Sequence, residues 1–195
     1  MTFTTSARCL FSITVLLIAL GATPAFAADT YELDPVHSTF QFRIKHLGVS
    51  YTYGRFNEQK GTIVVDEKDP SKNSIEIEIK TASVDTANKM RDEHLSGPDF
   101  FDVAKYPAMT FKSTSFKKKE GNAYAVEGDL TIHGVTKKVT LNATFVGAGP
   151  GMKGESGAGW EATLVINRAD YGMNYMPDAI GTEVTLQIAI EGVKK

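Results

Sequence analysis

The sequence has very little cysteine. Among its 195 residues, Cys9 is the single cysteine, and it lies in an N-terminal segment that we expect to be removed. The remaining chain then has no disulfide, no thiol nucleophile and no thiolate metal site. A fold without these links must be stable through its apolar core alone.

The sequence also lacks a charge excess and the motifs of common catalytic sites. It has 21 Lys and Arg against 23 Asp and Glu, and such a balance argues against nucleic acid as a partner. It contains no G-x-S-x-G nucleophile elbow and no HExxH or HxH zinc spacing. We therefore expect no enzyme and no cofactor, with a hydrolase built from His94, Asp92 and a nearby serine as the weaker alternative.

Long apolar runs are scarce as well, and the one at the start of the chain is too short to cross a membrane. Residues 10–22 are mostly apolar and follow Arg8, whereas a membrane-spanning helix needs about 20 apolar residues. Ala25 and Ala27 flank Phe26 in the small-x-small form of a cleavage site. We predict a signal peptide over residues 1–27, cleavage after Ala27, export to the periplasm and one domain over residues 28–195.

Most of the remaining sequence alternates apolar and polar residues. This period of two is typical of antiparallel strands with one apolar face. Turn residues separate the runs at even spacing, which suggests a sandwich or a closed barrel. The length after cleavage, 195 − 27 = 168 residues, favours an all-β barrel of eight antiparallel strands. The runs are residues 40–45, 51–65, 75–80, 109–116, 124–132, 139–145, 159–167 and 184–190.

One segment, residues 86–102, interrupts the strands. Asp85 or Thr86 is suited to cap a helix over residues 87–95, and Gly97-Pro98 should end it. The adjacent rings of Phe100 and Phe101 follow. We predict a short helical insertion that lies over one end of the barrel as a lid or as a plug.

Several motifs resemble those of the YceI-like family. They are LDPVHS at residues 33–38, HLG at 46–48, SVDT at 83–86, RDEHLSGPDFFDVAKYP at 91–107 and GDLTIHGVTK at 128–137. The resemblance implies a lipocalin-like barrel of eight strands with a long apolar tunnel. It also implies an amphiphilic isoprenoid ligand, such as a polyprenyl carrier lipid or a quinone tail.

The inward apolar residues are the first candidate site. A barrel of eight strands either fills with side chains or holds one slender ligand, and the residues alone leave both interpretations open. The family resemblance favours the tunnel. Its candidate lining residues are Phe40, Phe42, Ile44, Phe56, Phe100, Phe101, Phe111, Phe145, Trp160, Met173 and Met176.

Three polar residues are candidates for a head-group site or for an internal latch. His46 ends the first strand on the face of Phe42 and Ile44, where it can bond a head group or a carbonyl. Arg91 suits a phosphate, because its planar fork binds bidentately, or it can pair with Asp99 or Asp102 to hold the insertion. His94 lies on the same helix. A metal site would require His37, His94 and a carboxylate to converge, which the spacing does not predict.

The sequence therefore predicts a binding protein that sequesters an isoprenoid lipid, as a monomer or homodimer with transient membrane contact. Residues 170–181, with Met173 and Met176, form either a lid or merely a long loop. The alternative function is a stress-response or interaction scaffold with a filled barrel.

Overall fold

The structure is a computed structural model that describes Met1 and residues 28–151 and 154–195. The predicted signal peptide, apart from Met1, lies outside the described residues. Eleven strands form one sheet that closes on itself, because β1 pairs with both β4 and β11. The strands are β1 (Asp29–Leu33), β2 (Thr39–His46), β3 (Ser50–Phe56), β4 (Gln59–Val65), β5 (Ser74–Lys80), β6 (Val84–Asp85), β7 (Ala108–Lys118), β8 (Ala123–Ile132), β9 (Val135–Pro150), β10 (Ser156–Asn167) and β11 (Ile180–Lys194).

The eleven strands make an eight-stranded antiparallel barrel, because three pairs of them are broken halves of one strand. β1 and β2 both pair with β11. β3 pairs with β2, and β4 pairs with β1. In the same way β5 pairs with β4, and β6 pairs with β3. The predicted fold is confirmed. The run expected over residues 51–65 is interrupted at Asn57, whose backbone N–H donates to Ser83 O at 3.0 Å instead of to a neighbouring strand.

The alternating pattern places one apolar face inside the barrel. Phe40 lies opposite Ile188 in the register of β2 and β11, and Phe42 lies opposite Leu186. Gly54 leaves room for the Phe42 ring, because a Cβ there would lie 2.3 Å from it. Close ring-on-backbone packing of this kind explains a glycine inside a strand.

The insertion between β6 and β7 contains the helix α1 (Lys89–Ser96). The predicted caps Asp85 and Thr86 were wrong: Asn88 is the cap, and its side chain accepts from Arg91 N at 3.1 Å. The Asp85 side chain instead accepts from Ala87 N. Ala87 has a φ of 57°, which turns the chain before the helix begins. The helix ends at Gly97 as predicted.

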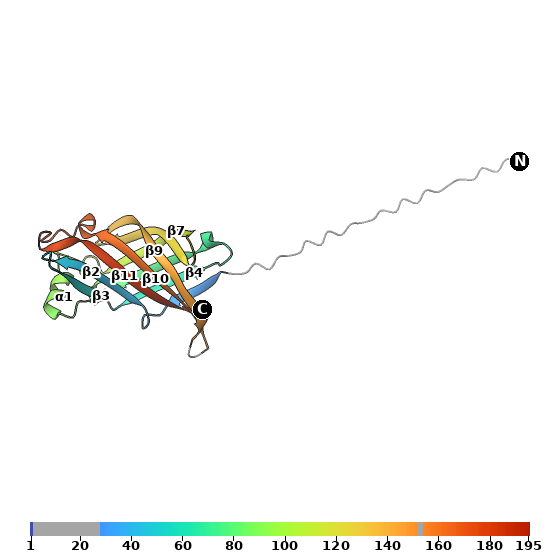
Figure 1. Ribbon diagram of the computed structural model, residues 1–195, viewed down its shortest axis with the longest axis horizontal. Helices are drawn as coiled ribbons and strands as arrows, with labels where there is room; N and C mark the ends of the chain where they lie inside the picture. Colours follow the sequence, from blue (N-terminus) through green and yellow to red (C-terminus); the bar gives the residue numbers. More distant parts are fainter. Residues whose placement is uncertain (2–27, 152–153) are drawn as a thin grey trace.

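The barrel is elongated and its two ends differ (Figure 1). The α1 end carries α1, the β2–β3 turn and residues 168–179, which include the 3-10 helix η3 (Arg168–Tyr171). The opposite end carries residues 66–73, with η1 (Pro70–Lys72); η2 (Thr81–Ser83) joins β5 to β6. Among the described residues, no helix has the length and apolar content needed to cross a membrane.

Candidate functional site

The interior of the barrel holds a cavity of about 920 Å³. Its lining includes Lys45 and His46 at the α1 end and Asp66 and Glu67 at the opposite end, so it runs along the whole barrel. β11 borders it from position 180 to position 190, a stretch of ten residue steps. At a rise of about 3.4 Å per residue and a strand tilt of about 40°, that stretch spans about 26 Å along the barrel axis. The inward side chains therefore leave an elongated tunnel and do not fill the barrel.

The wall of the tunnel is mainly apolar. Ten of the eleven predicted lining residues border it: Phe40, Phe42, Ile44, Phe56, Phe100, Phe101, Phe111, Phe145, Trp160 and Met173. Met176 differs from them. It is half exposed and is not among the described residues that border the cavity. Its backbone φ of 43° lies in the left-handed region.

Aromatic contacts close the tunnel wall near each end. At the α1 end the ring of Phe100 lies 5.1 Å from that of His94 and 5.4 Å from that of Tyr175, in edge-on geometry. At the opposite end Trp160 lies 5.5 Å from Tyr31 and 6.0 Å from Phe145. Edge-on aromatic pairs of this kind hold rings in defined positions, so both ends of the cavity have a preformed shape.

Arg91 and Asp92 hold α1 against the preceding strand through Thr86. Arg91 Nε donates to Thr86 Oγ1 and Nη2 donates to Thr86 O, both at 2.7 Å. Asp92 accepts from the backbone N–H and the hydroxyl of Thr86. The expected pairing of Arg91 with Asp99 or Asp102 was wrong, because Asp99 lies 3.0 Å from His94 Nε2 instead. Arg91 thus forms a latch and still borders the cavity.

The two candidate histidines lie at the same end of the tunnel. His46 is exposed at the end of β2, and His94 lies on α1 with its ring 5.2 Å from the ring of Tyr175. Both border the cavity. The structure therefore brings His46, Arg91 and His94 to one mouth, as a head-group site requires.

Arg168 is a buried residue of the site that was not among the residues predicted from the sequence. Only 3% of it is exposed, and it borders the cavity. Its guanidinium donates to four backbone carbonyls at 2.6–3.0 Å: those of Met173 and Tyr175 in the following loop, and those of Ile180 and Gly181 at the start of β11. A signal was present, because Trp160, Ala162, Leu164 and Ile166 point inward at every second position, and Arg168 continues that series.

Charge is distributed unequally along the tunnel. Lys45, Arg91 and Arg168 border its α1 end, whereas Asp66, Glu67 and Lys118 border the other end; Glu161 of β10 also borders the cavity. The four hydrogen bonds of the Arg168 guanidinium described above all go to carbonyls. Burial lowers the pKa of Arg168, but an arginine side chain stays protonated in proteins. The α1 end is therefore cationic and suited to an anionic or strongly polar group.

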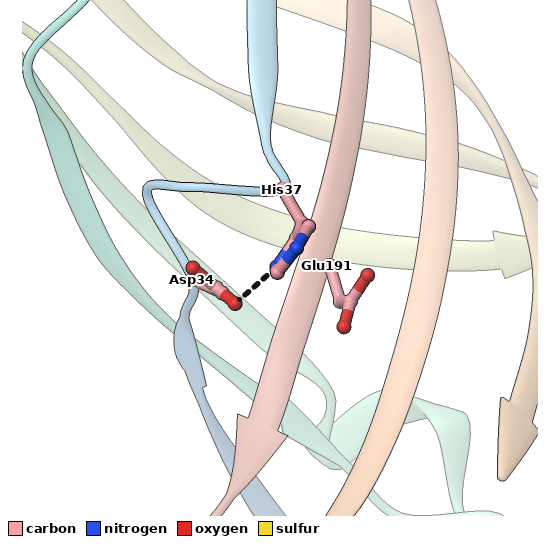
Figure 2. A group of neighbouring side chains, drawn as sticks. All are labelled: Asp34, His37 and Glu191. Atoms are coloured by element: carbon pink, nitrogen blue, oxygen red, sulfur yellow. Dashed lines mark hydrogen bonds and ion pairs between the residues drawn. The ribbon is translucent and has the colours of Figure 1, made fainter. Parts of the chain in front are cut away.

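A second polar group, Asp34, His37 and Glu191, lies where β1 turns into β2 (Figure 2). Their ligand atoms lie within 4.8 Å of one another, the one such set of three among the described residues. His37 Nδ1 lies 2.7 Å from Asp34 Oδ2, and this hydrogen bond raises the pKa of His37 and lowers the pKa of Asp34. Asp34 also accepts from Val36 N. Both carboxylate oxygens of Asp34 are thus used inside the turn, by Val36 N and by His37, so we assign this group to the turn. His94, on α1, pairs with Asp99 instead.

The fold and the tunnel together define a closed, lipocalin-like antiparallel barrel with an internal apolar site. The model of the YceI-like domain matches residues 31–192, and the chain belongs to the YceI-like family. Protein YceI of Escherichia coli O157:H7 is 41% identical over 190 residues, which cover 96% of this chain and 98% of that protein.

Solved structures share the fold. BcnA of Burkholderia cenocepacia superposes with a TM-score of 0.75 at 25% identity, over 82% of this chain and 98% of BcnA. A polyisoprenoid binding domain from Saccharophagus degradans, implicated in plant cell wall breakdown, superposes with a TM-score of 0.66 at 18% identity. That match covers 85% of this chain and 98% of the domain.

Proposed function

We propose that this protein binds an isoprenoid lipid in the barrel tunnel and carries it through the periplasm. The tunnel of about 920 Å³ is the observation that carries the proposal. Its volume lies at the upper end of the range of about 300–1,000 Å³ that is usual for ligand pockets. A site of this kind needs no chemistry on the ligand: it removes the apolar chain from water and later releases it.

The size of the tunnel suits a long chain. A water molecule, which is similar in size to a methylene group, occupies about 30 Å³, so 920 Å³ accommodates about 30 such groups. Burying each methylene contributes about 0.8 kcal/mol. Nanomolar binding needs about 12 kcal/mol beyond an association cost of about 4–15 kcal/mol. About 20–35 buried carbons meet this requirement, and a polyprenyl carrier or the tail of a quinone provides them.

The unequal charge suggests the orientation of the ligand. The cationic α1 end would hold the head group near Arg91, Arg168 and His46, with the isoprenoid tail extending towards Phe145 and Trp160. The polyisoprenoid binding domain from Saccharophagus degradans has the same fold and supports the ligand class. The segment 1–27, as a signal peptide, would place this activity in the periplasm.

A matched pair of variants tests the proposal. Ala162 borders the cavity, whereas Ala189 is exposed on the neighbouring strand β11, opposite Glu161 in the register. Ala162→Phe should reduce the amount of lipid that co-purifies with the protein, and Ala189→Phe should not. Native mass spectrometry measures the occupancy, and mass spectrometry of extracted lipid identifies the chain and head group. A protein that is empty in every preparation, or an occupancy that Ala162→Phe leaves unchanged, would contradict the proposal.

A further inference from the structure

Exposed apolar side chains gather at the α1 end of the barrel. Of the ten large apolar residues that are exposed in the described part of the chain, six lie on the β2–β3 hairpin, α1 or the loop before β11. These elements meet at the same end of the molecule (Figure 1). We call this set the rim patch: Leu47, Val49, Tyr51, Tyr53, Met90 and Met176.

Two members of the rim patch occupy backbone conformations that do not favour them. Leu47 has φ 49° and Met176 has φ 43°, in the left-handed region where glycine, asparagine and aspartate are the usual residues. Leu47 N donates to Ala179 O at 2.7 Å, so these two turns are adjacent. Asparagine at either position would suit both the backbone and the exposure to water. An apolar residue at both positions therefore indicates a role in contact with something outside the barrel.

The rim patch surrounds the cationic mouth of the tunnel. Met90 belongs to the patch and also borders the cavity. His46 precedes Leu47 at the hairpin, and Ile180 follows the Met176 turn; both border the cavity. Any surface that covers the patch would therefore face the opening through which a ligand enters.

The order of residues along the hairpin matches a lipid interface. Leu47 and Val49 occupy its tip, and Tyr51 and Tyr53 follow on β3. Tyrosine rings favour the headgroup level of a bilayer, with aliphatic side chains deeper. The guanidinium of Arg43 lies 4.8 Å above the ring of Tyr51, which places a cation beside the headgroups.

We propose that the rim patch docks on the surface of a lipid bilayer, with Leu47 and Val49 inserted, so that the lipid passes between the membrane and the tunnel mouth. This inference rests on the proposed lipid-carrying function. A bilayer is the chosen partner for two reasons. It is the source of an isoprenoid ligand, and the apolar tip, the tyrosines and the cation of the hairpin follow one another in the order of the acyl region, the headgroup level and the charged surface of a bilayer.

Co-sedimentation with vesicles of phosphatidylethanolamine and phosphatidylglycerol tests the inference. Leu47→Asn should weaken vesicle binding about tenfold, and adding Val49→Ser should weaken it further, because each change removes an inserted aliphatic side chain. Asparagine suits the left-handed backbone at position 47, so loss of the fold would not explain this result. Val165→Thr, at an exposed valine on the wall of β10, is the matched control and should leave vesicle binding unchanged.

The two proposals fail in different ways. If the hairpin variants sediment like the wild type, docking is refuted, whatever lipid the tunnel holds. If they instead convert a dimer to a monomer in analytical ultracentrifugation while sedimentation with vesicles is unchanged, the patch is an interface between two copies and docking is refuted. Reduced sedimentation with undiminished co-purifying lipid in native mass spectrometry supports docking. A wild-type tunnel that is always empty refutes the lipid-binding proposal itself.

Discussion

Replacing Arg168 with methionine should destabilise the α1 end of the barrel. The change keeps much of the apolar stem but removes the guanidinium that donates to Met173, Tyr175, Ile180 and Gly181 at 2.6–3.0 Å. Because Arg168 is 3% exposed, these carbonyls would lose their partner in a place that little water reaches. Residues 172–181, which are the loop before β11 and the first two residues of that strand, should therefore lose their defined conformation.

The size of the destabilisation follows from the number of hydrogen bonds that Arg168 makes. A hydrogen bond from a charged donor contributes about 1.5–3 kcal/mol, so four of them give an upper bound of about 6–12 kcal/mol. Removing the buried charge recovers part of its desolvation cost. The largest effects of single substitutions, such as loss of a buried hydrogen-bond network, reach about 4–5 kcal/mol, so we take about 3–5 kcal/mol. The unfolding entropy of about 2.1 cal/mol/K per residue, over the 168 residues from 28 to 195, is about 0.35 kcal/mol/K. We expect Tm to fall by about 9–14 °C.

Calorimetry and hydrogen exchange measure the two parts of this prediction. Arg168→Met should lower Tm by the stated amount and speed amide exchange in residues 172–181. Arg168→Lys should lie between the wild type and Arg168→Met, because one ammonium keeps the charge but does not reach four carbonyls in a fixed fork. Arg55→Met is the control: Arg55 is half exposed and pairs with Asp85 at 3.4 Å, an interaction expected to contribute less than about 1 kcal/mol. Equal effects of Arg55→Met and Arg168→Met on Tm would refute the reasoning.

Three further predictions concern separate parts of the molecule. Gly128→Ala should lower the free energy of unfolding in urea by about 1–3 kcal/mol, because its Cβ would lie 2.4 Å from the Phe111 ring; unchanged stability would show that the ring moves freely. Thr86→Val should cost about 1–3 kcal/mol and speed amide exchange in α1, whose latch uses that hydroxyl; unchanged exchange would contradict the latch. For the pair of His37 and Asp34, the hydrogen bond between them raises the pKa of the former and lowers that of the latter. The stabilisation that His37 provides is complete below about pH 6.5 and is lost as pH rises through its raised pKa. The stabilisation that Asp34 provides is complete above about pH 3.9 and is lost as pH falls through its lowered pKa. His37→Gln should therefore lower Tm most between about pH 4 and pH 6.5 and least at alkaline pH, and a difference that does not vary with pH would contradict this assignment.

The sequence by itself determined the architecture of the barrel. Alternation such as that of Phe40, Phe42 and Ile44 places side chains on two faces of a sheet, whatever the rest of the chain does. Turn residues between the runs predicted the hairpins, and Gly97-Pro98 marked the end of the helix. These are local properties, because they depend on residues that are neighbours along the chain.

Only the tertiary structure decided whether the barrel is filled or hollow. The interior volume depends on the number and tilt of all the strands together with the sizes of all the inward side chains. No single run of residues determines that volume. The latch is another example: Arg91 donates to Thr86, and Asp99 lies beside His94 instead. Local pattern predicts what each residue can do, but the partners of a charged side chain are fixed by folding.

The rim patch and the loop before β11 show the same difference between what the sequence predicts and what tertiary contacts decide. Leu47 and Met176 belong to segments far apart in the chain, and their turns become adjacent because β2 pairs with β11. Arg168 continues the inward alternation of β10, which the sequence contains. Its carbonyl partners come from a loop that has no periodicity and from the start of β11. The sequence thus determined a closed barrel with an apolar interior. Tertiary contacts decided where that interior opens and which charges face the opening, because these depend on distances between segments that only the closed sheet brings together.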